Sequence, residues 1–240
     1  MSDDNSKKNW FGDWADEYDE TIGKVGKHHD LLDLVVESSH VEENDHILDI
    51  GCGTGILALK FLKKSDCQVT GIDGSPEMLA VFEKKINKIG LNEKISCRYE
   101  ELSNMEFDEE AFDIISSTFT LHHIKDKYPM IEKIFKMLKS GGRLIIGEID
   151  MDTTGDVRDP KRFMRVMDYL KIEFSLALQE GGINAFSRMY DNGKKHILND
   201  GEYCISFKQW EALCQKANFK KIYAKAVPDF EWYKVLIAVK

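Results

Sequence analysis

Short segments rich in β-branched residues alternate with longer segments of helical periodicity through residues 46–148. The short segments have the composition of buried strands, at residues 46–50, 68–73, 95–99, 112–117 and 143–148; the helical ones lie near residues 54–64, 75–89 and 127–139. The connection between Tyr99 and Phe112 is short and acidic, and we expect a loop there. Strands that alternate with helices form βαβ units with parallel strands. The sequence therefore predicts a doubly wound α/β fold.

The alternation of strands and helices stops after residue 150. A helical pattern from Pro160 to Glu180 is followed by Gly181-Gly182 and a polar segment that we expect to be a loop. After a further helix at 207–217, Pro228-Asp229 joins two strand-like segments closely enough for an antiparallel hairpin. The full prediction is a mostly parallel seven-stranded sheet with a C-terminal antiparallel hairpin and a helical cap insertion.

This pattern divides the chain into four predicted parts. They are an N-terminal helical lid at 1–40, a core at 41–150, a helical cap at 151–200, and the last helix with the closing hairpin at 201–240. A chain of 240 residues is long enough for one core with an inserted cap.

The composition of the chain restricts the cellular compartment and the binding partners that we expect. The five cysteines form no CxxC pair, no segment approaches the roughly 20 apolar residues that span a bilayer, and the first nine residues are polar. We therefore expect a cytoplasmic protein with neither a signal peptide nor a membrane span. The formal charge of −9 disfavours the electrostatic attraction on which nucleic-acid binding depends.

A glycine-rich turn follows the first predicted strand, with glycines at 51, 53 and 55. Glycine lets the backbone turn sharply and approach a ligand closely. A dinucleotide fingerprint would need glycine at position 56, which is Ile56, and no phosphate-binding Gly-Lys-Ser/Thr is present. The second strand ends in Asp73, a carboxylate suited to two ribose hydroxyls. The pattern indicates an adenosine pocket without a pyrophosphate loop.

Several segments together resemble the class I S-adenosylmethionine-dependent methyltransferases, in the branch that includes small-molecule and quinone-biosynthesis enzymes. ILDIGCGTG at 47–55 resembles the first motif of that family and VTGIDGSPEML at 69–79 the second. Residues 99–124 resemble the region around the fourth strand, and MLKSGGRLII at 137–146 the turn into the fifth. The resemblance implies S-adenosylmethionine as methyl donor and S-adenosylhomocysteine as product.

Carried onto this sequence, the resemblance implies a set of cofactor-binding residues. Asp49, Gly51, Cys52 and Gly53 would surround the methionine portion, and Asp73 and Gly74 would lie beside the ribose. Met78, Glu101 and Leu102 would surround the adenine, and Ser117 and Thr118 would lie near the sulfonium. Met78 is equally well explained as a core methionine, and Glu100 is an alternative to Glu101.

Two residues are candidates for catalysis. Tyr18 lies in a segment that resembles the family's lid, and it shares a predicted helical face with Trp10 and Trp14. His122 stands where a general base would lie, although a structural role is the alternative. We expect no metal, because the acidic residues 148, 150 and 152 fit a solvated strand end.

The expected function is methyl transfer to a small-molecule acceptor whose identity the sequence does not give. Candidates for lining the acceptor pocket are Phe163, Met167, Phe186 and Tyr190, which could equally form the core of the cap. The alternatives are modification of a tRNA wobble nucleoside, and a non-catalytic protein that binds S-adenosylmethionine as a regulator.

Overall fold

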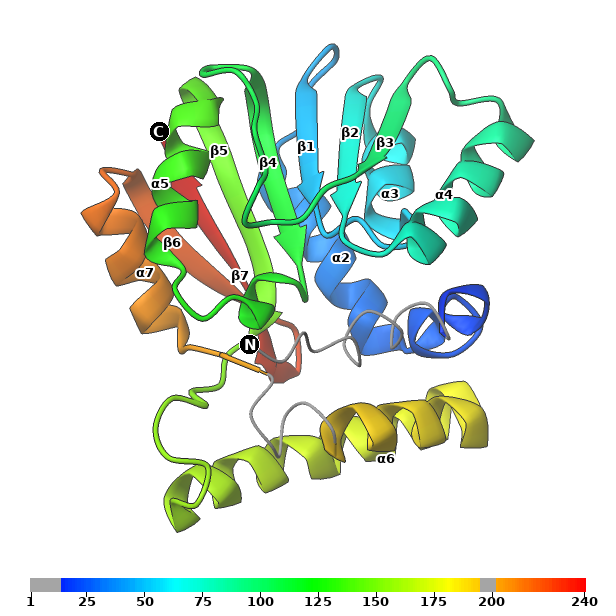
Figure 1. The fold of residues 1–240 in the computed structure, drawn as a ribbon, viewed down its shortest axis with the longest axis vertical. Helices are drawn as coiled ribbons and strands as arrows, with labels where there is room; N and C mark the ends of the chain where they lie inside the picture. Colours follow the sequence, from blue (N-terminus) through cyan, green and yellow to red (C-terminus); the bar gives the residue numbers. More distant parts are fainter. Residues whose placement is uncertain (1–13, 195–201) are drawn as a thin grey trace.

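The computed structural model describes residues 14–194 and 202–240, in which seven strands form one sheet (Figure 1). The strands are β1 (His46–Ile50), β2 (Gln68–Asp73), β3 (Ile95–Tyr99), β4 (Phe112–Thr118), β5 (Leu138–Ile149), β6 (Lys220–Val227) and β7 (Phe230–Val239). Their order is β3-β2-β1-β4-β5-β7-β6. The first five are parallel, whereas β7 is antiparallel to both β5 and β6. The predicted fold class is confirmed.

Helices cover both faces of this sheet: α2 (Gly26–Ser39), α3 (Ile56–Lys64) and α4 (Pro76–Ile89) lie on one face, and α5 (Tyr128–Met137) and α7 (Phe207–Lys216) on the other. Helix α6 (Pro160–Asn192) lies across one end of the sheet (Figure 1). The 3-10 turns are η1 (Ala15–Glu17), η2 (Ile22–Lys24) and η3 (Leu121–His123). None of these described helices is long and apolar enough to cross a bilayer.

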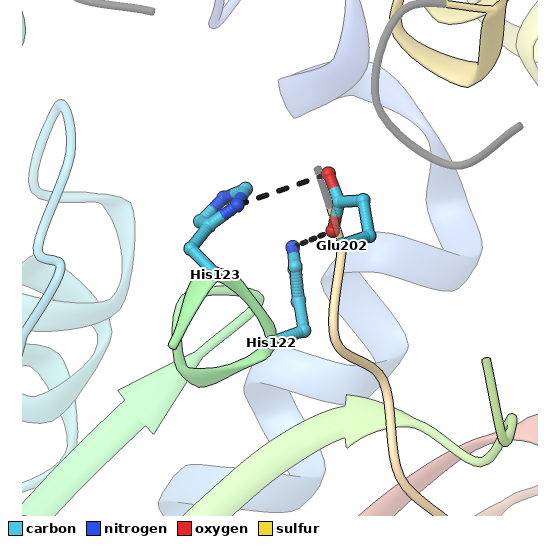
Figure 2. A group of neighbouring side chains, drawn as sticks. All are labelled: His122, His123 and Glu202. Atoms are coloured by element: carbon cyan, nitrogen blue, oxygen red, sulfur yellow. Dashed lines mark ion pairs between the residues drawn. The ribbon is translucent and has the colours of Figure 1, made fainter. Parts of the chain in front are cut away.

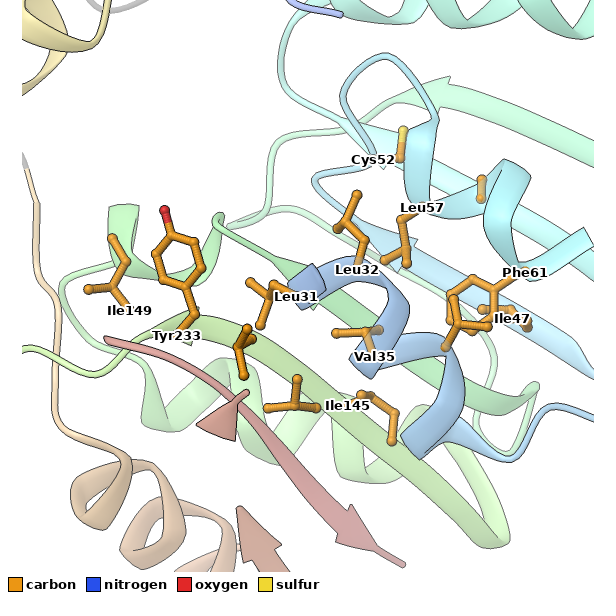
Figure 3. Close-up of a cluster of buried hydrophobic side chains, with 14 of the residues drawn as sticks. Leu31, Leu32, Val35, Ile47, Cys52, Leu57, Phe61, Ile145, Ile149 and Tyr233 are labelled. Atoms are coloured by element: carbon orange, nitrogen blue, oxygen red, sulfur yellow. The ribbon is translucent and has the colours of Figure 1, made fainter. Parts of the chain in front are cut away.

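The core has two layers because successive side chains of a strand point to opposite faces. Ile47 of β1 packs with apolar residues of α2, α3 and α4, such as Leu31 and Phe61 (Figure 3). The next residue, Leu48, packs on the other face with residues of α5 and α7, including Ile131 and Trp210. The central strands β1 and β4 are therefore buried on both faces, whereas the edge strands β3 and β6 are largely exposed.

The cap differs from the prediction after Gly182. That glycine has φ 74° and ψ −169°, which interrupts α6, and residues 183–192 are helical rather than a polar loop. The second limb folds back on the first, since the ring of Phe174 lies 6.0 Å from Phe186 and 5.6 Å from Tyr190. The predicted loop was wrong because residues 183–192 have aromatic partners on the first limb.

Candidate active site

The glycine turn after β1 brings the chain to the carboxyl edge of the sheet. Gly51, Gly53 and Gly55 have φ of 71°, 52° and 84°, a region that residues with a Cβ rarely adopt. A Cβ at Gly51 would lie 2.0 Å from Thr120 Oγ1, and one at Gly55 would lie 2.0 Å from the Phe82 ring. No described atom lies within 4 Å of a Cβ at Gly53. The outer glycines are needed for packing, and the middle one leaves space open.

The Asp73 carboxylate fixes this turn against the end of β2. One oxygen accepts a hydrogen bond from the backbone N–H of Gly53, and the other from that of Ser75, both at 2.8 Å. Burial raises the pKa of Asp73, and the two backbone N–H groups act in the opposite direction. Carboxylate oxygens can accept further hydrogen bonds, so Asp73 retains capacity for a ligand.

Asp49, near the end of β1, has one carboxylate oxygen without a hydrogen-bond partner among the described residues. Its other oxygen accepts a hydrogen bond from the Ser116 hydroxyl at 3.1 Å. Burial raises the pKa of Asp49 to about 7; the Ser116 hydrogen bond lowers it and the charge of Asp73 raises it. A buried carboxylate oxygen without a partner is costly. A cationic ligand group at this oxygen would satisfy it.

These residues line a first cavity of about 480 Å³. It contains every predicted cofactor-binding residue except Ser117. The described residues that line it are Tyr18, His28, Leu32, Asp49, Gly51, Cys52, Gly53, Thr54, Ile56, Leu57, Asp73, Gly74, Ser75, Met78, Glu101, Leu102, Ser103, Thr118, Phe119, Thr120, His123 and Ile124. Glu101 lines the cavity, whereas the alternative, Glu100, forms an ion pair with Arg98 at 3.1 Å.

Ser117 was predicted to lie near the cofactor, but it does not line the cavity. Its side chain is fully buried, and its hydroxyl donates to the backbone carbonyl of Ile50 at 2.9 Å. Because residues alternate along β4, the neighbouring Thr118 faces the cavity instead. Ser117 therefore joins β4 to β1.

A second cavity of about 100 Å³ adjoins the first. Tyr18, His28, Phe119 and His123 line both cavities. The other described residues of the second cavity are Trp14, Ile22, Val25, His122, Ile149, Tyr169, Glu173, Met189, Asn192, Glu202 and Tyr233. Most of them come from the turns before α2, from α6 and from β7. His28 and Glu173 were not predicted to line a cavity, and no local motif marks either residue.

His122 is not positioned as the free general base that the sequence suggested. Its Nδ1 lies 2.8 Å from Glu148 and its Nε2 lies 2.9 Å from Glu202, so both ring nitrogens have carboxylate partners. Burial alone would lower the pKa of His122, but Glu148 and Glu202 outweigh burial and raise it to about 10. A protonated ring cannot accept a proton from an acceptor. The alternative, structural role fits His122 better.

Tyr18 and His28 lie together where the two cavities meet. The Tyr18 ring packs edge-to-face on Trp14 and on His28, with centroids 5.2 and 6.3 Å apart. Burial raises the pKa of Tyr18, so the phenol stays protonated near neutrality. Burial lowers the pKa of His28 to about 4, and its Nδ1 has no hydrogen-bond partner among the described residues. Of the predicted helical face, Trp10 lies outside the described residues.

The residues predicted to line an acceptor pocket do not line either cavity. Phe163 is exposed on α6, and Phe186 and Tyr190 pack with Phe174 between the two limbs of that helix. The buried face of α6 instead carries Val166, Tyr169 and Leu170, together with buried Arg162 and Glu173. The buried residues of α6 are therefore other than the predicted candidates.

The acidic residues at the end of β5 diverge. Glu148 faces His122, whereas Asp150 pairs with Lys234 at 2.5 Å and accepts from the backbone N–H of Phe207 at 2.9 Å. Asp152 accepts a hydrogen bond from the backbone N–H of Thr154 at 2.8 Å. These three carboxylates do not converge on one point.

Comparison with known proteins shows what the central part of the chain resembles. Residues 48–146, which contain the glycine turn and Asp73, match a family described as a methyltransferase domain. Over these residues the chain is similar to the class I S-adenosylmethionine-dependent methyltransferases. Within this methyltransferase family, ubiquinone biosynthesis O-methyltransferase of Coxiella burnetii is 30% identical over 144 residues, which cover 58% of this chain and 60% of that protein. Demethylmenaquinone methyltransferase of Lactiplantibacillus plantarum is 27% identical over 56% of this chain and 59% of its own length.

The chain spans less than two thirds of the length of these curated methyltransferases. Among solved structures, phosphoethanolamine N-methyltransferase 2 of Haemonchus contortus superposes with a TM-score of 0.69 at 18% identity, covering 98% of this chain and 59% of that one. A methyltransferase of Methanococcus maripaludis has a TM-score of 0.66 at 18% identity and covers 100% of this chain and 97% of its own. These structural matches share the methyltransferase fold.

Proposed function

We propose that this protein transfers the methyl group of S-adenosylmethionine to a small molecule bound in the second cavity and releases S-adenosylhomocysteine. The observation that carries the proposal is the junction of the two cavities at Tyr18, His28, Phe119 and His123. A donor in the first cavity and an acceptor in the second would meet at that junction. We assign the acceptor only as a small molecule.

The first cavity suits S-adenosylmethionine in shape and in charge. The open space at Gly53 would receive the methionine portion, and the unpartnered oxygen of Asp49 would accept from its ammonium group. Asp73 has acceptor capacity left for ribose hydroxyls. Met78 and Leu102 supply apolar contacts for the adenine, and Glu101 supplies an acceptor for its amino group.

When bound, the cofactor supplies a methyl group on a positively charged sulfur, which is already activated for transfer. The protein then has to align the acceptor and exclude water, and such positioning contributes roughly 7–11 kcal/mol in favourable cases. His28 is neutral, and its free Nδ1 would accept a hydrogen bond from an acceptor O–H or N–H. Tyr18, which stays protonated, would donate one. Both residues would orient the acceptor at the junction.

The N-terminal lid and the cap form part of the wall of the second cavity. The turns η1 and η2 and the helix α6 contribute Tyr18, Ile22, Tyr169 and Met189 to the walls of the second cavity. We propose that they shield the junction from water. The net charge of −9 disfavours a nucleic-acid acceptor, and five free cysteines suit the cytoplasm as the location that we propose.

Titration calorimetry with S-adenosylmethionine and S-adenosylhomocysteine tests the donor site first. We expect saturable binding of both at one site per chain. Incubation with tritiated S-adenosylmethionine and fractionated cell metabolites then tests transfer and reveals the acceptor. Heat without any label transfer would favour the non-catalytic regulator, and label in tRNA would favour the nucleoside enzyme. Absence of heat with both ligands would refute the proposal.

A further inference from the structure

Three side chains from distant parts of the chain converge beside the second cavity (Figure 2). His122 and His123 lie in η3, directly after β4, and Glu202 lies in the segment that precedes α7. One nitrogen or oxygen from each residue lies within 4.8 Å of the others. His122 Nε2 is 2.9 Å from Glu202 Oε2, and His123 Nδ1 is 3.8 Å from Glu202 Oε1. Two imidazole nitrogens therefore face one carboxylate.

A fourth residue fixes the orientation of this group. The Glu148 carboxylate lies 2.8 Å from His122 Nδ1, and it accepts hydrogen bonds from the backbone N–H groups of Thr120 at 3.0 Å and His122 at 3.3 Å. Glu148 is held by the backbone and in turn holds the imidazole so that Nε2 points at Glu202. Histidines that bind metals commonly donate their other N–H to a carboxylate in this way.

We propose that His122, His123 and Glu202 bind a divalent transition-metal ion of the Zn²⁺ or Fe²⁺ kind. Two imidazoles and one carboxylate are a ligand set that both ions accept. Mg²⁺ and Ca²⁺ prefer oxygen ligands and fit the set poorly. The ion would take the place of the proton on His122 Nε2, whereas Nδ1–H would still donate to Glu148. No local motif marks this site, because Glu202 is distant from both histidines along the chain.

The three ligands lie where a bound ion could contact a molecule in the second cavity. His122 and Glu202 line the second cavity, and His123 lines both cavities. Three protein ligands leave coordination positions free on Zn²⁺ or Fe²⁺. The free positions would be available to an oxygen or nitrogen of a molecule in the second cavity. This last step rests on the proposed function, but ion binding itself does not.

The metal-free alternative is a buried ion pair in which protonated His122 joins Glu148 to Glu202. It predicts no selective metal binding, so a binding measurement separates the two. Protein stripped with a chelator and dialysed would be titrated with Co²⁺, which reports imidazole and carboxylate ligands through its visible absorption. Competition with Zn²⁺ in a calorimeter would give the affinity. We expect one ion per chain.

Substitutions locate the ion. Glu202→Gln and His123→Asn should each weaken Co²⁺ binding at least tenfold, and Glu148→Gln should weaken it by about 10–100-fold through the orientation of His122. The matched control is His40→Asn, since His40 is exposed at the end of α2 with φ 49°, a conformation that asparagine tolerates. The control should bind Co²⁺ as the wild type does.

Each sample would also be titrated with S-adenosylhomocysteine and melted thermally, which shows whether the variants fold. Lost Co²⁺ binding with retained cofactor binding in Glu202→Gln, whose site lines only the second cavity, would support the metal site. If the wild type takes up no Co²⁺, or if folded Glu202→Gln and His123→Asn bind it unchanged, the metal site is wrong and the cluster is an ion pair. Metal binding without cofactor binding would instead refute the proposed function alone.

Discussion

The two cavities share a wall, yet they are built in different ways. Much of the first cavity consists of segments that directly follow β1, β2, β3 and β4, where one local turn supplies several residues. The second cavity combines residues from the turns before α2, from α6, from β7 and from the segment before α7. The first depends mainly on local chain geometry and the second on long-range packing.

Their polar groups differ in the same way. The first cavity presents Asp49 with an oxygen that lacks a hydrogen-bond partner among the residues described. In the second, Glu173 accepts from the Tyr233 hydroxyl, and Glu202 pairs with His122. The first cavity is therefore poised for a cationic group, whereas the second holds its carboxylates in internal contacts. Substitutions in the first cavity should therefore weaken ligand binding, whereas substitutions of the second cavity's carboxylates should mainly change stability.

Gly53→Val should have the largest effect, because it fills the open space in the first cavity. We expect the affinity for S-adenosylhomocysteine to fall at least 100-fold, which is about 2.8 kcal/mol. The matched control is Gly90→Val, since Gly90 also has positive φ, 71°, and no described atom within 4 Å of an added Cβ. Calorimetry and thermal melts on both variants measure the difference.

Both glycine variants should lose similar stability, because valine is strained in a left-handed conformation. Only Gly53→Val should lose the ligand. Equal ligand affinities in the two variants would show that Gly53 does not face the cofactor, and the contrast between the cavities would fail at its main point.

Asp73→Asn should have the next largest effect. It removes the charge that would bind the ribose, and hydrogen bonds to charged groups contribute roughly 1.5–3 kcal/mol. We expect the affinity for S-adenosylhomocysteine to fall about tenfold or more. Asp113→Asn is the control, because Asp113 also accepts from a backbone N–H, that of His46 at 2.9 Å, but at the opposite end of the sheet. If Asp113→Asn weakens binding as much as Asp73→Asn, the effect is a general loss of structure.

The sequence predicted the first cavity well for a physical reason. A strand that enters a glycine turn and a second strand that ends in Asp73 bring their residues to one sheet edge in any parallel α/β fold. Ser117 does not line the cavity, because successive residues of β4 face opposite ways and only Thr118 of the predicted pair faces it. His28 could not be found in this way, because its place depends on how α2 packs against the sheet.

The second cavity could not be predicted because the buried face of α6 is not an apolar stripe. An apolar stripe normally marks the buried face of a helix. In α6 that face includes Arg162, whose Nε donates to the Thr153 carbonyl at 2.7 Å, and Glu173, while Met164 is 57% exposed. Hydrogen bonds to distant residues compensate for burial of these charges, and no local pattern encodes such partners.

Ligand binding should depend on pH through Asp49. Its pKa of about 7 means that the carboxylate is mostly charged at pH 8 and mostly protonated at pH 6. Because the charged form attracts the ammonium group, the affinity for S-adenosylhomocysteine should fall about tenfold between pH 8 and pH 6. Asp49→Asn should bind more weakly at pH 8 and show a flat profile by calorimetry. A wild-type profile as flat as that of the variant would exclude Asp49 from the ligand site.

The smallest expected effect is on the free energy of unfolding, through Glu173 in the wall of the second cavity. Burial raises the pKa of Glu173 to about 7, while hydrogen bonds from Tyr233 and Tyr169 lower it. The native state thus retains a proton that the unfolded chain has lost, so wild-type stability falls as the pH rises through about 7. Glu173→Gln removes this titration. Its free energy of unfolding, relative to wild type, should rise by about 1 kcal/mol between pH 6 and pH 8.

Urea denaturation at both pH values measures this gain, with Glu231→Gln on the exposed surface of β7 as the control that should show none. Cofactor affinity should stay within about twofold of wild type in Glu173→Gln, because Glu173 lines only the second cavity. If Glu173→Gln loses cofactor binding and its stability depends on pH as that of the wild type does, the assignment of Glu173 to the second cavity alone is wrong. Glu173 would then be coupled to the donor site, and the two cavities would not be separable by substitution.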